Sequence, residues 1–248
     1  MTPNRPHPAD VEKLLDAVVT ISDRGREGLS AWAEAFIAAH LRAPGGLSIE
    51  VGTNAGGSAV LFCGLLELMY GWAHTPPLWT VDPYGSKPYV GGHGDRPEDQ
   101  PPIYTDAQYL AMKHNLHRAP YHAHWLMPAM EFFRRMEGLP YWRPGKRTQQ
   151  TVNVANGKLL EQVIGEQHLA GWAHTTFILL DGEHSAQAIC AEVQEAWSWL
   201  QVGGGLVIDN IDTDPATRDR LLAMHDFGRR SVLLSLELST QWATGVRR

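Results

Sequence analysis

Apolar residues recur at helical spacing in the first part of the chain. Positions 11, 14, 15, 18 and 19 are apolar and predict a helix from Ala9 to about Ile21. Positions 32, 36, 37 and 41 repeat the pattern, and the pair Gly45-Gly46 ends this second helix. Residues 1–44 are therefore expected to form two N-terminal helices, which could cap the rest of the domain or join two copies into a homodimer.

Short apolar runs then alternate with amphipathic segments. The runs predict five strands, at Leu47–Val51, Leu78–Val81, His124–Met127, Thr176–Leu180 and Leu206–Ile208. The segments between them predict helices at Ser58–Trp72, Ala186–Leu200 and Pro215–His225. Two further strands, near Ser231–Leu238 and Gln241–Val246, have the pattern of an antiparallel hairpin. Residues 1–248 thus predict a single α/β domain, with a Rossmann-like, seven-stranded, mostly parallel sheet and helices on both faces.

Two stretches interrupt this alternation. Residues 85–103 are rich in Gly and Pro, and residues 138–175 include a predicted helix around Lys158–Gln167. Insertions of this length in a compact domain are usually functional lids or disordered. Their aromatic and histidine side chains favour lids over a substrate, and the candidate substrate contacts are His93, Tyr104, Tyr141, Trp142, Trp172 and His174. Several of these side chains could equally pack the insertions onto the sheet.

Composition narrows the class of partner. The chain has 27 acidic and 21 basic residues, a formal charge of -6, so it has no positive field that would attract nucleic acid or an anionic membrane. Its first residues lack the apolar core of a signal peptide, and no stretch supplies the roughly 18 apolar residues of a spanning helix. We expect a cytoplasmic protein that acts on a small molecule.

A glycine-rich turn, EVGTNAGGS at residues 50–58, lies between a predicted strand and a predicted helix. Residues without a Cβ let the backbone approach a ligand, and the helix N-terminus presents free N–H groups to it. The glycine spacing differs from the G-x-G-x-x-G of dinucleotide sites, and Glu50 would repel a pyrophosphate. A ligand that carries an ammonium group fits this turn better.

Acidic side chains follow three other predicted strands. Asp82 could accept hydrogen bonds from ribose hydroxyls, although Asp-Pro is also a common turn opener. Asp181 and the pair Asp209-Asn210 end two strands whose carboxyl ends share one edge of the sheet, so their oxygens are expected to converge on Mg²⁺. Alone, Asp209-Asn210 is better explained as a helix cap, and His184 as a packed or solvated histidine.

Taken together, these motifs resemble class I S-adenosylmethionine-dependent methyltransferases. Within that class they are similar to the metal-dependent O-methyltransferases typified by the catechol and caffeoyl-coenzyme A enzymes. The resemblance spans roughly Leu47 to the carboxyl terminus and rests on the E-x-G-x-x-x-G turn and on Asp181 with Asp209-Asn210. FILLDGEHS and GGGLVIDN also resemble a bacterial branch whose members methylate sugar hydroxyls.

The resemblance implies a set of contacts with S-adenosylmethionine. Glu50 and Ser58 would hold its methionine end, and Gly52 and Gly56 would leave room for it. The remaining implied contacts are Asn54 in the turn, Asp82 at the ribose, and Ala129 and Met130 beside the adenine.

The resemblance also implies a metal and a base. Asp181, Asp209 and Asn210 would bind Mg²⁺ or another divalent cation, which makes Asp181 part of the catalytic site. His184 occupies the position, three residues after the first metal aspartate, at which catechol-type enzymes place a catalytic lysine. A neutral imidazole accepts a proton at physiological pH, so His184 is the candidate general base.

The expected activity is metal-dependent methylation of a hydroxyl on a sugar, a natural product or an aryl diol. Two alternatives stay open, because a fold does not fix a function. One is an enzyme of the same fold that does not transfer methyl groups, such as a hydroxylase-like relative. The other is a non-catalytic protein that only binds the cofactor. A nicotinamide oxidoreductase is disfavoured by the glycine spacing.

Overall fold

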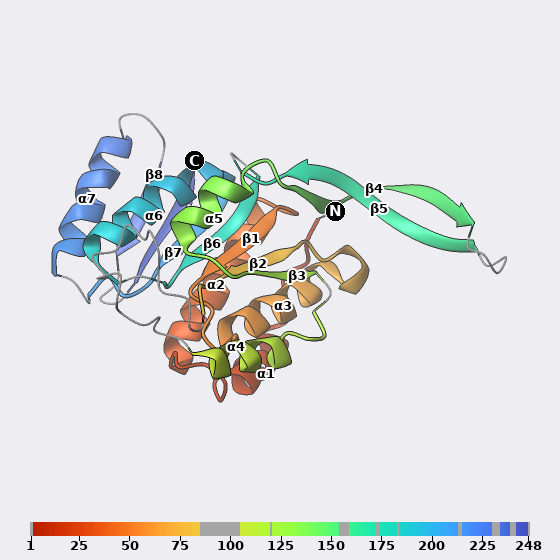
Figure 1. Ribbon diagram of the computed structural model, residues 1–248, viewed down its shortest axis with the longest axis horizontal. Helices are drawn as coiled ribbons and strands as arrows, with labels where there is room; N and C mark the ends of the chain where they lie inside the picture. The colour runs from red at the N-terminus through yellow and green to blue at the C-terminus, as the bar shows by residue number, and fades with distance from the viewer. Residues whose placement is uncertain are drawn as a thin grey trace.

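Helices and strands alternate along almost the whole chain (Figure 1). The computed structural model describes residues 2–84, 105–119, 121–153, 159–171, 174–182, 184–212, 215–229, 234–238 and 242–247. The helices are α1 (Pro8–Val18), α2 (Arg26–Arg42), α3 (Gly57–Tyr70), the short 3-10 helix η1 (Trp72–His74), α4 (Asp106–Asn115), α5 (Ala129–Met136), α6 (Ala186–Trp199) and α7 (Pro215–Arg229). The strands are β1 (Leu47–Val51), β2 (Leu78–Val81), β3 (His122–Trp125), β4 (Pro140–Asn153), β5 (Leu159–Leu169), β6 (Thr175–Leu180), β7 (Leu200–Ile208), β8 (Leu234–Leu238) and β9 (Ala243–Arg247).

The main sheet has seven strands in the order β3-β2-β1-β6-β7-β9-β8. The neighbours from β3 to β7 pair in parallel, whereas β9 lies antiparallel between β7 and β8. The predicted α/β class, the mostly parallel sheet and the antiparallel pair at its end are therefore confirmed. Because the parallel strands share one direction, their carboxyl ends form a single edge, where ligands bind in such sheets.

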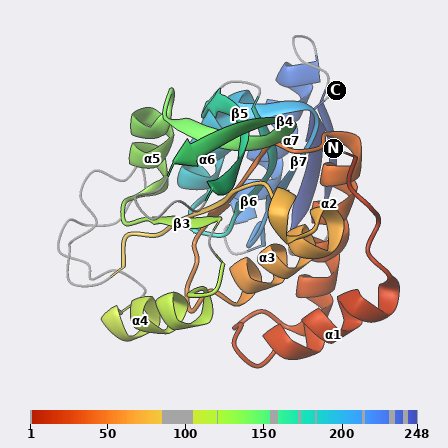
Figure 2. The same cartoon turned by 90° about the vertical axis from the view of Figure 1, so that its right-hand side faces the viewer.

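Both faces of the sheet are covered by helices (Figures 1 and 2). Successive side chains of a strand point to opposite faces. In β6, Phe177 and Leu179 therefore pack under α1, α2 and α3, while Ile178 and Leu180 belong to a second core with α5, α6 and α7. The N-terminal helices α1 and α2 thus cap one face of the sheet.

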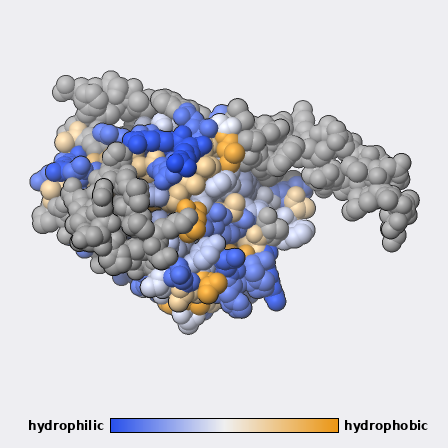
Figure 3. All heavy atoms as spheres, in the orientation of Figure 1, coloured by the Kyte–Doolittle hydropathy of each residue, from blue (hydrophilic) through white to orange (hydrophobic). Residues whose placement is uncertain are grey.

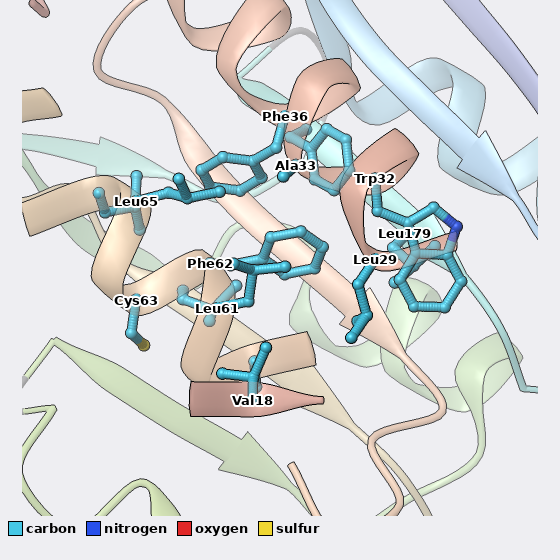
Figure 4. Close-up of a cluster of buried hydrophobic side chains, with 14 of the residues drawn as sticks. Val18, Leu29, Trp32, Ala33, Phe36, Leu61, Phe62, Cys63, Leu65 and Leu179 are labelled. Carbon is cyan, nitrogen blue, oxygen red and sulfur yellow. The ribbon is translucent and has the colours of Figure 1, made fainter. Parts of the chain in front are cut away.

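Aromatic packing fixes α2 and α3 on this face (Figure 4). Phe36 of α2 stacks on Phe62 of α3 with ring centroids 4.7 Å apart, and it meets Phe177 of β6 edge-on at 4.8 Å. All three rings are fully buried. Truncation of such a side chain typically costs about 3–5 kcal/mol. The cluster therefore holds in place α2 and α3, both of which contribute residues to the candidate site.

The second insertion forms a long hairpin, so the helix predicted around Lys158–Gln167 is wrong. Strand β5 pairs antiparallel with β4 from Leu169 opposite Pro140 to Leu159 opposite Asn153, with a register shift between Arg143 and Thr148. The pairing partner lies in another segment of the chain, and a local pattern cannot reveal the hydrogen bonds that it supplies.

The hairpin leaves the domain at the amino-terminal edge of the sheet. It follows α5, which returns the chain to that edge, and it ends just before β6 begins. At its base the N–H of Ala170 donates to the carbonyl of Leu139, and the N–H of Leu47, the first residue of β1, donates to the carbonyl of His174. Figure 1 shows the hairpin projecting away from the sheet. The lid role expected of this insertion stays a prediction.

Among the described residues, no helix is both long enough and apolar enough to span a membrane. On the face seen in Figure 3, the coloured part of the surface is mostly polar, with apolar side chains in small separate groups. The homodimer expected from the sequence stays a prediction.

Candidate active site

Four chain segments meet at the carboxyl edge because the parallel strands end in register. The N–H of Gly52 donates to the carbonyl of Val81, and the N–H of Asp181 donates to the carbonyl of Val51. In the same way the backbone N–H groups of Asp82 and Asp209 each donate to a backbone carbonyl at the end of the neighbouring strand. These bonds set the glycine-rich turn, Asp82, Asp181 and Asp209 side by side, as the sequence predicts.

The turn from β1 to α3 depends on glycine at two positions. Gly52 has a φ of 82°, and a Cβ there would lie 2.0 Å from the carbonyl oxygen of Asp181. Gly56 has a φ of 84° and packs against Met112 of α4, which is 3.2 Å from the position of its missing Cβ. Both glycines therefore allow protein segments to approach closely. The space that they were expected to leave for a cofactor stays a prediction.

Glu50 lies beneath the turn and is fully buried. Neither of its carboxyl oxygens makes a hydrogen bond of good geometry within the described part of the chain. Burial raises the pKa of Glu50 to about 8, and the nearby hydroxyl of Ser58 opposes the shift only in part. A buried carboxyl group without partners is costly, so this position favours a ligand that brings a donor or a positive charge.

Asp82 anchors the turn from the side of β2. Its carboxylate accepts hydrogen bonds from the backbone N–H of Thr53 at 2.9 Å and of Tyr84 at 3.2 Å, while the hydroxyl of Tyr84 donates to the carbonyl of Asn54. Burial raises the pKa of Asp82 to about 6, and these backbone donors lower it in part. Each carboxylate oxygen has a second lone pair, so contact with a ribose stays a prediction.

The tips of β6 and β7 meet around a cluster of polar side chains. Nδ2 of Asn210 donates to Oδ1 of Asp181 at 2.7 Å and lies 3.1 Å from Nε2 of His184. Asn210 has a φ of 56°, a left-handed conformation that is uncommon outside glycine and recurs at functional sites. Burial and the neighbouring carboxyl of Asp209 raise the pKa of Asp181 well above its ordinary value. The predicted meeting of Asp181, Asp209, Asn210 and His184 is therefore present.

A cation from the N-terminal part of the chain reaches the same cluster. Nη2 of Arg24, in the connection between α1 and α2, lies 2.8 Å from Oδ1 of Asp209. Burial raises the pKa of Asp209, and the guanidinium of Arg24 opposes that rise. Asp209 thus faces a permanent positive charge supplied by the protein, while Asp181 faces the amide of Asn210.

The donor set fits a divalent cation in its chemistry. Asp181, Asp209 and the side-chain oxygen of Asn210 are the hard oxygen ligands that Mg²⁺ prefers. In the observed arrangement, however, Arg24 faces Asp209 and the amide nitrogen of Asn210 faces Asp181. Within the described residues, no cluster of three or more His, Cys, Asp or Glu side chains is arranged to hold a metal.

One small cavity joins the turn to this cluster. Its lining includes Gly52, Asn54 and Ser58 from the turn and Asp181 from the tip of β6. The opposite wall comes from the connection between α1 and α2, with Ile21, Ser22 and Asp23, and from Trp32 of α2. The cavity volume of about 10 Å³ accommodates roughly one water molecule. The segment of residues 21–24 therefore lies directly against the predicted cofactor turn.

Other predicted contacts lie apart from this cavity. Ala129 and Met130 begin α5 directly after β3 and are buried, so their contact with adenine stays a prediction. Tyr141 and Trp142 belong to β4, and His174 precedes β6, all on the amino-terminal side of the sheet. Their expected contact with a substrate stays a prediction. His93, Tyr104 and Trp172 fall outside the described residues.

Nothing in the sequence marks Asp23, Arg24 and Trp32 as residues of the candidate site. No spacing along the chain links them to positions 54 and 209, because the contact arises only when α2 packs on the sheet. The one local signal that could have pointed to them is the charged pair Asp23-Arg24 between two predicted helices. Such pairs are common at ordinary surface turns.

Comparisons with known proteins identify solved structures that share the fold of this chain. No family model matches the sequence, and a search of curated proteins gave no match. Among solved structures, the O-methyltransferase NovP superposes with a TM-score of 0.56 at 14% identity, over 92% of this chain and 82% of NovP. The chain has the fold of an O-methyltransferase.

Two further solved structures superpose over most of the chain. The SAH-bound methyltransferase PaMTH1 of Podospora anserina gives a TM-score of 0.52 at 11% identity, over 98% of this chain and 89% of its own. A protein of Corynebacterium glutamicum gives 0.51 at 14% identity, over 97% of this chain and 90% of its own. The likeness covers nearly the whole chain, including α1 and α2.

Proposed function

We propose that this chain transfers a methyl group from S-adenosylmethionine to a hydroxyl of a small molecule. The observation that carries the proposal is the shared cavity, in which the turn of β1 and Asp181 of β6 form adjacent walls. A cofactor held by the turn would thereby present its reactive end to the cluster of Asp181, His184 and Asn210.

The cofactor end of the site supplies charge complementarity. Glu50 offers a carboxylate to the ammonium group of the methionine moiety, and Asp82 lies beside the turn for the ribose. The N-terminus of α3 has no side-chain cap, so its free N–H groups suit the carboxylate of the methionine moiety. The cavity is far smaller than typical ligand pockets of about 300–1,000 Å³, so binding requires residues 21–24 to shift.

The chemical step is a direct displacement. The acceptor oxygen forms a bond to the methyl carbon as the bond from that carbon to sulfur breaks, and His184 takes the hydroxyl proton. Nδ2 of Asn210 is a donor and lies 3.1 Å from Nε2 of His184, so the carboxamide has to turn away before that nitrogen accepts the proton. Orientation supplies much of the rate, since aligned reactants reach effective molarities of about 10⁵–10⁸ M.

A divalent cation belongs to this proposal through Asp181, Asp209 and Asn210. When bound, Mg²⁺ supplies positive charge that lowers the pKa of a coordinated hydroxyl. The residues of the chain supply the remaining functions: Asp181 and Asp209 face the acceptor side, and His184 holds the proton. Sugars, natural products and aryl diols all stay candidate acceptors.

Isotope transfer tests the activity. Purified protein is incubated with S-adenosylmethionine carrying a deuterated methyl group and with separate panels of sugars, glycosylated natural products and catechols. Mass spectrometry is expected to find one labelled product class and an equal amount of S-adenosylhomocysteine. Calorimetry with the cofactor and with NAD separates this function from an oxidoreductase. Tight cofactor binding with no labelled product from any panel would favour the non-catalytic alternative.

A further inference from the structure

The cation at Asp209 comes from the protein itself. Nη2 of Arg24 lies 2.8 Å from Oδ1 of Asp209, and the side chains are 18% and 2% exposed. Ion pairs at the surface contribute little, but a pair this sheltered from water is screened much less. The contact joins residues 185 positions apart, which makes it a feature of the folded domain rather than of a local turn.

Aromatic rings hold the guanidinium in place. Its central carbon lies 5.3 Å from the ring centroid of Trp32 and 5.6 Å from that of Trp242. Arginine favours such a setting, because a planar guanidinium stacks on rings while its N–H groups face a carboxylate. Trp32 belongs to α2 and Trp242 directly precedes β9, so distant elements build the site around this side chain.

The neighbours of Arg24 are fixed on the cofactor turn. Nδ2 of Asn54 donates to Oδ2 of Asp23 at 2.6 Å, and the backbone N–H of Arg24 donates to Oγ of Ser22 at 3.1 Å. Cα of Ser22 packs within 2.8 Å of the position that a Cβ on Gly57 would occupy. Contacts on three consecutive residues therefore keep the guanidinium directed at Asp209.

The position of the guanidinium overlaps that of a metal ligand shell. Mg²⁺ binds carboxylate oxygens at about 2.0–2.1 Å and demands near-octahedral geometry. A cation bound to Oδ1 of Asp209 would therefore meet a positive charge already 2.8 Å from the same atom. The guanidinium already occupies part of the space around this oxygen, although no hydrogen bond of good geometry joins the two among the described residues.

We propose that Arg24 is the resident cation of the Asp181–Asp209 pair and that a divalent metal binds there only by displacing it. The inference concerns the same site as the proposed function, but its evidence is the arrangement of charged side chains. Metal binding therefore tests it without any measurement of methyl transfer. Movement of residues 21–24 on cofactor binding would withdraw Arg24 and free Asp209. The chain thus protects its acidic pair until that segment moves.

Manganese binding tests the displacement. Mn²⁺ is titrated into cofactor-free protein, and the unbound ion is followed by electron paramagnetic resonance for wild type, Arg24→Gln and Arg24→Met. The Met variant keeps an apolar stem between the two rings and serves if Arg24→Gln does not fold. Removal of the guanidinium is expected to tighten Mn²⁺ binding at least about tenfold, the effect of about 1.4 kcal/mol.

Two matched variants make the result specific. Arg26→Gln removes a cation two residues away that pairs with Glu12 and Asp16 at the surface, and it should bind Mn²⁺ as wild type does. Adding Asp209→Asn to the Arg24 variant should abolish the gain in Mn²⁺ affinity. Equal affinity in wild type and the Arg24 variants would overturn the proposal, as would a gain that survives Asp209→Asn. Labelled methyl transfer is measured separately, so its failure leaves this result intact.

Discussion

The side-chain amide of Asn210 donates a 2.7 Å hydrogen bond to the carboxyl group of Asp181. The same nitrogen lies 3.1 Å from Nε2 of His184. One residue at the end of β7 therefore orients two side chains that follow β6. Its left-handed backbone is what turns the carboxamide toward them.

Replacement of Asn210 should impair the chemical step. Asn210→Gly removes the carboxamide while glycine accepts the left-handed backbone readily, so the loop should keep its path. We expect kcat to fall roughly 10²-fold, as misplacement of a reacting group by about 1 Å can do, with cofactor affinity unchanged. Steady-state kinetics and calorimetry measure the two quantities. Full activity in Asn210→Gly would show that the carboxamide is dispensable.

His184→Ala should lower kcat by about 10²–10⁴-fold, the usual contribution of a general base. Affinity for S-adenosylmethionine should stay within about twofold, because His184 is not among the residues that line the cavity beside the turn. His114→Ala, on the exposed surface of α4, is the matched control. Wild-type turnover in His184→Ala would assign the proton to another group.

Glu50 should make the stability of the cofactor-free protein depend on pH. Burial raises its pKa from 4.5 to about 8, so the folded state keeps the proton over a range in which the unfolded chain has released it. The unfolded state then binds fewer protons, and stability falls as pH rises through this range. Glu50→Gln removes the effect. The stability of Glu50→Gln relative to wild type, measured by thermal unfolding, should increase with pH by at most about 1.4 kcal/mol per pH unit.

The same residue should couple cofactor binding to proton release. An ammonium group beside Glu50 favours the ionised carboxylate, so binding at neutral pH should expel a proton from wild type but not from Glu50→Gln. Calorimetry in two buffers of different ionisation enthalpy measures the released proton. Glu34→Gln, on the exposed side of α2, should behave as wild type. Equal proton release in all three proteins would remove Glu50 from the cofactor site.

The hairpin of β4 and β5 should be removable. Leu139 and Ala170 are already hydrogen-bonded at its base, so a short glycine-containing turn can join them. The shortened protein should fold, and its cofactor affinity should match that of wild type, because the hairpin leaves from the far edge of the sheet. Circular dichroism and calorimetry check both points. Loss of cofactor binding in a folded variant would restore a role for the hairpin in the site.

Much of the sheet is predictable from sequence. The bounds of β1 and β2 agree with prediction, and the start of β6 differs by one residue. Buried parallel strands are continuous apolar runs between glycine and proline breakers, which makes them easy to locate. The acidic tips at Asp181 and Asp209 also follow from sequence, because parallel strands bring their carboxyl ends to one edge whatever the loops do.

Contacts between distant segments escape the same reasoning. The ion pair of Arg24 with Asp209 depends on how α1 and α2 pack, and the hairpin depends on pairing between strands. Helices α4 and α5 are short and were not predicted. The carboxylate of Asp82 lies where sequence places it, but its observed partners are backbone N–H groups of the turn. Local pattern gives the position of a side chain and not its partners.

Gly52 has a consequence for how such a protein can be altered. Even one carbon atom at this position would collide with the backbone of Asp181, so the loop after β1 and the loop after β6 lie in direct backbone contact here. A substitution that displaces either loop is transmitted to the other. Re-engineering toward a new acceptor must therefore leave this junction untouched and draw its variation from segments that do not border it.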